Sequence, residues 1–177
     1  MEIDTFRSAR PDDAEAIAQL VNQAFRPRTG IAGWTHEAHL VAGDRIDPDR
    51  VRQFVAAEGC VLLLGMAGTE IVACMQLERA GTRVSIGMLA VAPDCQGGGL
   101  GKAMLAHAEA HAVQRWQVEK FVMRVLPARA ELLAFYLRRG YRRSGEVSDY
   151  PVNTAGVPLQ AELKIETLEK DAPGGIR

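Results

Sequence analysis

The sequence predicts one α+β domain, in which about four helices cover both faces of a mixed, mostly antiparallel sheet of about seven strands. The chain has 177 residues, a length that suits one domain and a short excess rather than two domains. Short apolar runs and glycine-containing turns fill its middle, and helical and extended patterns alternate after residue 93. We therefore expect a single domain over residues 1–170 and a frayed tail over residues 171–177.

The composition favours a globular protein that is neither disordered nor embedded in a membrane. Hydrophobic residues make up 47% of the chain, charged residues 24%, and the formal net charge is −1. This balance argues against disorder and provides no basic excess for a nucleic acid, and no window reaches the roughly 20 apolar residues of a membrane span. The charged start lacks the apolar core of a secretion signal, and three cysteines show no close pairing. We therefore expect a cytoplasmic protein.

The first third of the chain predicts a strand, two helices and a long connection. Residues 6–10 are typical of a short strand, and residues 11–25 place apolar side chains at helical spacing after a proline. Residues 26–47 show no period, so they form either a functional loop or a segment with a short helix. Asp47 and Pro48 then begin a second helix, which ends near Gly59.

The middle of the chain predicts antiparallel hairpins. The apolar runs 60–64, 71–77 and 84–91 are separated by short turns that contain glycine. Gly87 lies inside the third run, which indicates a bulge or a close approach of another group to the backbone. The last part predicts a helix over 100–116, a strand over 120–126, a helix over 129–139, and a pair of strands over 141–152 and 159–168.

The strongest motif is a strand that leads through a glycine-rich turn into a helix, over residues 89–104. Four glycines, Gly97, Gly98, Gly99 and Gly101, leave the backbone uncovered there. Their N–H groups and the positive end of the helix dipole favour a bound phosphate. The turn does not match a nucleotide-binding P-loop, because Ala103 stands where that loop needs a hydroxyl, and the dinucleotide pattern GxGxxG fails in every frame. A nucleotide hydrolase is therefore disfavoured.

The segment Gln96-Gly97-Gly98-Gly99-Leu100-Gly101, preceded by Leu89-Ala90-Val91, resembles the acyl-CoA signature of the GNAT superfamily of N-acetyltransferases. The segment 133–141 resembles the second landmark of that family, a helix with a tyrosine followed by glycine and an aromatic residue. The resemblance implies a GNAT fold with a splayed central pair of strands. It also implies acetyl-CoA as the acyl donor, with no metal, and a homodimer as a possible assembly.

The resemblance assigns the acetyl-CoA site to the strand and turn. Backbone groups of Leu89, Ala90 and Val91 would hold the pantetheine arm, and backbone N–H groups of the turn would hold the pyrophosphate. The implied donors come from Gln96, Gly97, Gly98, Gly99, Leu100 and Gly101, and Lys102 lies either near the phosphates or in solvent.

The resemblance makes Tyr136 the general acid. When an amine attacks the thioester, a thiolate leaves and needs a proton, which a phenol with a pKa of about 10 can donate at neutral pH. Without the resemblance, Tyr136 would be interpreted as a core aromatic residue of an amphipathic helix.

Two residues depart from the family pattern. Arg129 stands seven residues before the tyrosine, where many relatives have an asparagine that contacts CoA, so that contact is absent or replaced. The strand over residues 84–91 lacks the glutamate that serves as the general base in many relatives. The base is then Glu78 on the neighbouring strand, a residue of the loop around His36 and Glu37, or a water chain.

The acceptor is expected to be a small-molecule or peptide primary amine, with no nucleic acid or membrane as partner. The implied acceptor region contains Trp34, His36, Glu37 and Tyr150, and its carboxylates and aromatic rings suit a cationic amine. The pairs His36/His39 and His107/His111 do not indicate a metal, because no third ligand is evident. The missing strand glutamate keeps a second function open, that of a non-catalytic acyl-CoA-binding module.

Overall fold

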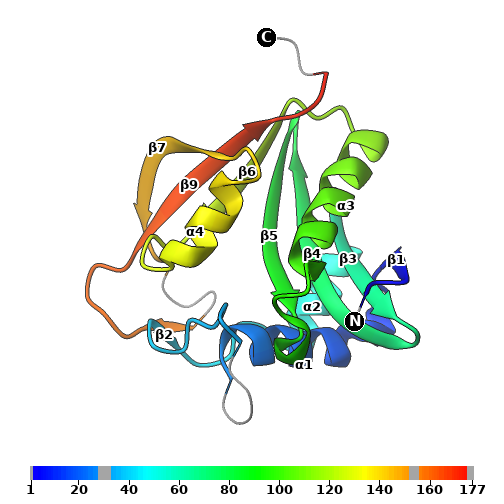
Figure 1. Cartoon of the computed structure of the whole chain (residues 1–177), viewed down its shortest axis with the longest axis horizontal. Coiled ribbons are helices and arrows are strands. Elements are labelled where there is room, and N and C mark those ends of the chain that lie inside the picture. Colours follow the sequence, from blue (N-terminus) through cyan, green and yellow to red (C-terminus); the bar gives the residue numbers. More distant parts are fainter. Residues whose placement is uncertain (1, 28–32, 152–155, 175–177) are drawn as a thin grey trace.

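The computed structural model describes residues 2–27, 33–151 and 156–174. Its main sheet has seven strands, which confirms the predicted α+β class (Figure 1). Their order is β1 (Thr5–Ser8), β3 (Cys60–Ala67), β4 (Glu70–Ala80), β5 (Arg83–Val91), β6 (Lys120–Val125), β9 (Lys164–Asp171) and β7 (Arg142–Asp149).

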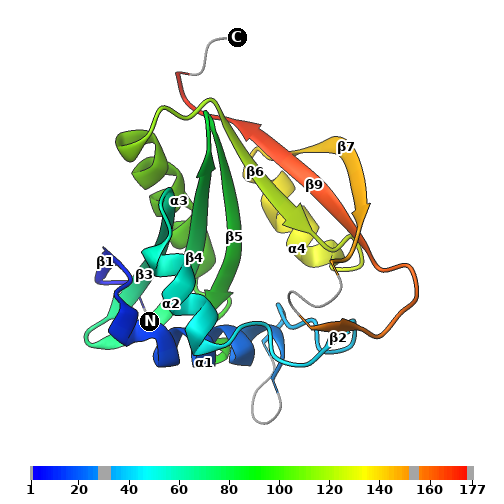
Figure 2. The same cartoon turned by 180° about the vertical axis from the view of Figure 1, so that it is seen from behind.

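Helices cover both faces of the sheet. One face packs against α1 (Ala14–Phe25) and α2 (Pro48–Ala56), which lie in front of the sheet in Figure 2. The other face packs against α3 (Leu100–Arg115) and α4 (Ala130–Leu137), in front in Figure 1. Both helices begin where the sequence predicts. A 3₁₀ turn at Pro11–Asp13 leads into α1. At the start of α2, the Asp47 side chain accepts a hydrogen bond from the backbone N–H of Arg50.

The central strands β5 and β6 diverge. They pair in parallel over three positions, from Arg83 opposite Lys120 to Ser85 opposite Val122, and every other pair in the sheet is antiparallel. Beyond Ser85 the two strands separate, and Figure 2 shows the V-shaped gap between them. This gap is the predicted splayed central pair. The backbone N–H and C=O groups that face it have no strand partner, so they are available to a ligand.

A bulge in β5 lies at this gap. Between the pairs Cys74–Ala90 and Gln76–Gly87, β5 has one residue more than β4. Met88 in this extra stretch has a φ of 49°, a left-handed conformation that non-glycine residues seldom adopt. The prediction of a bulge near Gly87 is therefore confirmed.

The bulge exchanges the two faces of β5. Before it, Val84 and Ile86 pack in the core that includes α3; after it, Met88 and Ala90 pack in the core that includes α1. Without the extra residue, alternation would keep all four side chains on one face. As a result, Leu89 turns towards the α3 side of the sheet, where the glycine turn begins.

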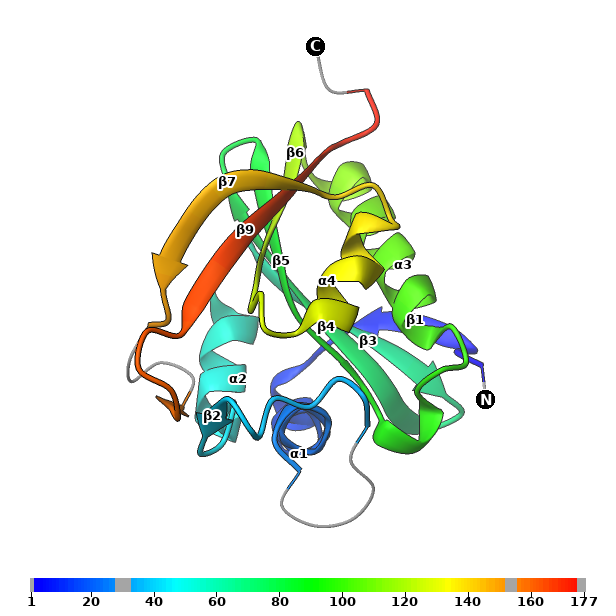
Figure 3. The ribbon, with the colours of Figure 1, turned by 60° about the vertical axis from the view of Figure 1, so that its left-hand side comes forward.

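The last strands differ from the prediction. The predicted strand over 159–168 is wrong in its first half, because β9 begins at Lys164 and Glu162 forms a turn with a φ of 67°. Residues ahead of that turn form β8 (Val157–Pro158), which pairs with β2 (Val41–Ala42) as the orange arrow beside β2 in Figure 3. β8 thereby closes over the connection between α1 and α2, which contains no helix in its described residues.

The last strand extends one residue into the segment predicted as the tail. β9 extends to Asp171, and the Ala172 side chain is buried in the core that contains α3. The final residues of the predicted tail, 175–177, lie outside the described part of the structure. Among the described residues, no helix combines the length and hydrophobicity that are needed to cross a bilayer.

Candidate functional site

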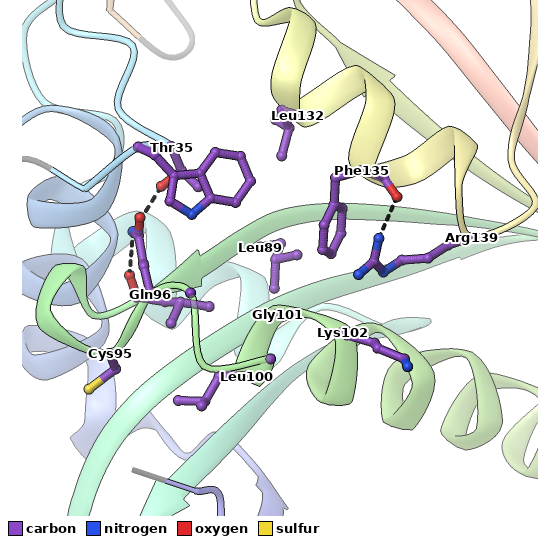
Figure 4. Close-up of a pocket in the computed structure, with 14 residues that line it drawn as sticks. Thr35, Leu89, Cys95, Gln96, Leu100, Gly101, Lys102, Leu132, Phe135 and Arg139 are labelled. Atoms are coloured by element: carbon purple, nitrogen blue, oxygen red, sulfur yellow. Dashed lines mark hydrogen bonds between the residues drawn. The ribbon is translucent and has the colours of Figure 1, made fainter.

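Two cavities meet where β5 separates from β6. The glycine-turn cavity lies on the α3 and α4 side and is lined by the turn after β5 together with one face of α4 (Figure 4). The polar cavity lies on the α1 and α2 side and is lined by β4, β5, β6, α2 and the segment before β8. Leu89 and Leu132 line both cavities, so these two side chains mark the boundary between them.

The glycine turn points backbone donors into its cavity. Gly97 and Gly99 both have a φ of 85°, and Gly99 precedes α3 without a side-chain cap. The first N–H groups of α3, those of Leu100, Gly101 and Lys102, have no carbonyl four residues earlier within the helix. Because a Cβ atom at Gly97 or Gly99 would meet open space, an anion can approach the backbone closely.

Gln96 holds this turn in place and does not offer hydrogen-bond donors to a ligand in the cavity. Its Nε2 donates to the Val91 carbonyl and to Thr35 Oγ1, each at 3.0 Å, and its backbone N–H donates to the Pro93 carbonyl at 3.4 Å. A side chain at Gly33 would overlap the Gln96 amide, so that position needs glycine. The donors of Gln96 are thus used within the protein, and its role is to hold the turn against the loop that contains Thr35 (Figure 4).

The floor of the glycine-turn cavity is apolar. A Cβ atom at Gly101 would lie 3.7 Å from Phe135, 3.8 Å from Val91 and 3.9 Å from Leu89. Leu89 and Val91 line the cavity, whereas Ala90 lies on the opposite face, in the core beneath α1. The predicted run 89–91 therefore borders the cavity through alternate side chains.

Two cations line the same cavity. One is Lys102, whose side chain is exposed. The other is Arg139, whose guanidinium lies 3.4 Å from the centroid of the Phe135 ring while its Nη1 donates to the Phe135 carbonyl at 2.7 Å. Burial lowers the pKa of Arg139. The predicted acceptor residue Trp34 also borders this cavity, with its ring 6.4 Å from that of Phe135.

Tyr136 lines the polar cavity from α4. Its side chain is buried, and burial raises the pKa of the phenol to about 12, although Arg129 and Arg139 favour the ionised form. Its hydroxyl forms no hydrogen bond with the other described residues. The phenol therefore stays protonated at neutral pH and has a proton to donate.

Glu78 lies on the floor of the polar cavity. It is exposed on β4, opposite Ser85 of β5, and Gln76 on the same face of β4 is opposite Gly87. A Cβ atom at Gly87 would meet nothing within 4 Å, so the absence of a side chain there widens the cavity next to Glu78.

The predicted residues Glu37 and Tyr150 belong to a buried ionic cluster. Glu37 Oε1 accepts from Arg26 Nη2 at 2.9 Å, and Glu37 Oε2 accepts from Arg129 Nη1 at 3.1 Å. Arg26 Nη2 also donates to the Tyr150 hydroxyl at 3.3 Å, and Arg129 Nη2 donates to the Thr35 carbonyl. The position that departs from the family pattern, Arg129, thus holds the loop after α1 against the start of α4.

None of the four histidines lines either cavity. His36 contacts the ring of His39 at 5.6 Å, and neither residue lines a cavity. His107 stacks on Phe6 at 4.0 Å, with His111 one turn further along α3. Within the ranges that the structure describes, no group of three or more His, Cys, Asp or Glu side chains is arranged to hold a metal ion.

Comparisons with known proteins agree with this geometry. The family model for the acetyltransferase (GNAT) family matches residues 15–141. The fold is similar to that of the ribosomal-protein-S18-alanine N-acetyltransferase from Escherichia coli, with a TM-score of 0.71, 16% identity, and 98% of each chain covered. It is also similar to the PaiA N-acetyltransferase from Thermoplasma acidophilum in complex with coenzyme A, with a TM-score of 0.72, 13% identity, and 94% and 98% of the two chains covered. Among curated proteins, none matches the sequence significantly.

Proposed function

Because the chain belongs to the GNAT family of acetyltransferases, which transfer acyl groups from acetyl-CoA, we propose that it acetylates a primary amine by direct attack of that amine on the thioester. The observation that carries the proposal is the junction between the two cavities at the gap after Ser85. An acyl donor in the glycine-turn cavity and an amine in the polar cavity would meet beside Leu89 and Leu132.

The glycine-turn cavity has the chemistry that acetyl-CoA requires. Its backbone donors at the start of α3 suit a pyrophosphate, the unpaired edge of β5 suits an extended amide-containing arm, and Lys102 and Arg139 add positive charge. Acetyl-CoA supplies an acyl group that is activated as a thioester. The alternating positions Leu89 and Val91 form the wall along which the arm would lie.

The polar cavity supplies the proton transfers. An amine must lose a proton before it attacks, and we assign Glu78, on the cavity floor, as the group that accepts this proton directly or through water. As the N–C bond forms and the C–S bond breaks, the Tyr136 hydroxyl donates its proton to the leaving sulfur. Tyr136 is protonated at neutral pH, as this role requires.

A non-catalytic acyl-CoA-binding module is the second candidate function. One observation favours it: the cavity-facing position on β5 opposite Gln76 is Gly87, so this strand offers no carboxylate to the amine. The glycine-turn cavity would then serve as the whole functional site.

Release of free thiol from acetyl-CoA, in the presence of a panel of primary amines, tests the proposal. We expect turnover by the natural sequence and a fall in kcat/KM of about 100-fold for Tyr136→Phe, since a positioned general acid typically contributes 10²–10⁴-fold. The matched control is Tyr141→Phe, because Tyr141 is also buried but its hydroxyl donates to Glu109 at 2.7 Å, outside both cavities. Equal effects of the two substitutions would exclude Tyr136 as the acid. A higher Tm with acetyl-CoA but no thiol release would favour the binding module.

A further inference from the structure

Three arginines gather around one buried carboxylate at the polar cavity. Arg26, Arg45 and Arg129 surround one carboxylate, Glu37, and Phe25 lies below the guanidinium groups of Arg45 and Arg129 at 5.8 Å and 5.4 Å from its ring centroid. Both oxygens of Glu37 are already taken, one by Arg26 and one by Arg129. Three guanidinium groups therefore lie around this carboxylate, and Arg45 forms no ion pair with it.

Arg45 is the member of this group that faces the cavity without an ion pair. It is half-buried and lines the polar cavity, and no carboxylate of the described residues forms a salt bridge with it. Asp44 and Asp47 also line the cavity, but both are exposed and neither pairs with Arg45. Burial lowers the pKa of Arg45, and the nearby charge of Glu37 offsets only part of this effect.

The backbone around Arg45 is fixed in place. Its N–H donates to Asn22 Oδ1 at 2.7 Å, and Asn22 Nδ2 donates to the Ile46 carbonyl at 2.8 Å. Together with a bond from the Ile46 N–H to Asn22 Oδ1 at 3.2 Å, these hydrogen bonds anchor the backbone of the segment to α1, and the Arg45 guanidinium lies over the Phe25 ring at the cavity. A pre-positioned cation of this kind binds an anion without the entropic cost of ordering a loop.

We infer that the acceptor is a small amine of the amino-acid class and that Arg45 binds its carboxylate. A guanidinium binds a carboxylate through two parallel N–H···O bonds, and in a partly desolvated site this contact is among the strongest polar contacts available. The inference rests on the proposed function, because it specifies which amine that reaction uses. It also accounts for the opposite charges in the cavity: Arg45 takes the carboxylate, while Glu78 takes the ammonium group.

Paired acceptors test the inference directly. Each of the twenty common amino acids is compared with its carboxamide in the thiol-release assay, because the carboxamide retains the amine but lacks the negative charge. We expect turnover for a subset of the amino acids and a kcat/KM at least tenfold lower for their carboxamides. Arg45→Gln should raise the KM for those amino acids by about 10–100-fold, leave kcat and the affinity for CoA nearly unchanged, and have little effect on the carboxamides.

Two further variants show whether the effect of Arg45→Gln comes from loss of the paired carboxylate contact or only from loss of a positive charge. A Tm measurement shows whether the variant is folded. Arg79→Gln removes an exposed arginine of β4 that lines neither cavity and should leave the KM unchanged. Arg45→Lys retains the charge but not the paired geometry, and should lie between Arg45→Gln and the natural sequence. A Tm that does not fall in Arg45→Gln would show that the variant is folded, as we expect when repulsion within the cluster is relieved.

The possible outcomes separate the inference from the proposed function. If carboxamides or simple alkylamines react as well as amino acids, or if Arg45→Gln has the KM of the natural sequence, the inference is overturned and acetyl transfer stands. If no amine releases thiol, the proposed function fails. The same amino acids are then titrated against the CoA-bound protein by thermal shift: stabilisation that Arg45→Gln abolishes supports the carboxylate site, and no stabilisation by any amino acid overturns it.

Discussion

The two cavities are built from different parts of the chain. In the glycine-turn cavity, the polar groups are mostly backbone N–H groups from one continuous segment, between Gly97 and Lys102. In the polar cavity, they are side chains from segments far apart, such as Glu37, Arg45, Glu78 and Tyr136. Backbone donors suit a ligand that is always the same, whereas side chains can be exchanged one at a time. The difference indicates that the acyl-donor side is constrained by conformation and the acceptor side by charge.

The largest expected effect concerns the charge that holds the polar cavity together. In Glu37→Gln, two guanidinium groups with side-chain exposures of 4% and 9% lose their shared counterion. We expect the free energy of unfolding to fall by about 3–5 kcal/mol, as when one partner of a buried ion pair is removed. Urea denaturation measures this fall. The exposed partner of Arg52 provides the control, Asp49→Asn, which should have little effect; a similar loss in both variants would contradict the role of the cluster.

The second prediction concerns the backbone conformation of the glycine turn. Gly99 has a φ of 85°, so Gly99→Ala should lower the free energy of unfolding by about 1–2 kcal/mol through strain in the left-handed region. The turn should relax away from this conformation, and the affinity for CoA should fall while the acceptor KM stays unchanged. Denaturation and titration calorimetry with CoA measure the two effects. Unchanged CoA affinity would show that the turn does not bind the phosphates.

Gly101→Ala tests the same cavity by separating the effect on CoA affinity from the effect on stability. Gly101 lies inside α3 and its Cβ position has only ordinary contacts, so alanine should stabilise the free protein by about 0.5–1 kcal/mol through helix propensity. The added methyl group lies in the glycine-turn cavity, so the affinity for CoA should nevertheless fall. Stability and affinity would thus move in opposite directions in one variant, which thermal unfolding with and without CoA can detect. Tighter CoA binding would contradict this placement.

The smallest expected effect lies outside both cavities, on α3. Burial lowers the pKa values of His107 and His111, and for His111 the neighbouring positive charges of His107 and Arg115 add to the shift. The unfolded chain then binds more protons than the folded chain below a pH of about 6.5, so stability should be complete above that pH and decline as the pH falls. His111→Gln should make this decline in stability less steep when Tm is measured at a series of pH values below about 6.5. An unchanged slope would contradict the assignment.

The parts of the site that depend on local conformation could be predicted from the sequence. The glycine turn and the bulge near Gly87 follow from residue types that occur where the backbone needs unusual angles. The family itself follows from the same motif and from the helix that contains Tyr136.

The parts that depend on distant contacts could not be predicted. Glu37 and Arg129 are 92 residues apart, and Arg26 and Tyr150 are 124 residues apart, so no local pattern links them. Arg139 was part of a basic run in the sequence, but only the direction in which α4 ends places its guanidinium on Phe135 rather than in solvent. The apolar pattern does not mark the start of β9, because the apolar residues before it, Val157 and Leu159, are more than half exposed in a connecting segment.

Thr35 connects the two cavities. Its hydroxyl accepts from Gln96, which fastens the glycine turn, and its carbonyl accepts from Arg129, which pairs with Glu37 in the polar cavity. Any displacement of the turn by one ligand therefore reaches the Arg129–Glu37 ion pair of the other cavity through a single residue. Thermodynamic linkage then requires reciprocity: the factor by which CoA changes the affinity for the acceptor equals the factor by which the acceptor changes the affinity for CoA. Any coupling between the two ligands is thus a property of the Gln96–Thr35–Arg129 connection as much as of either cavity.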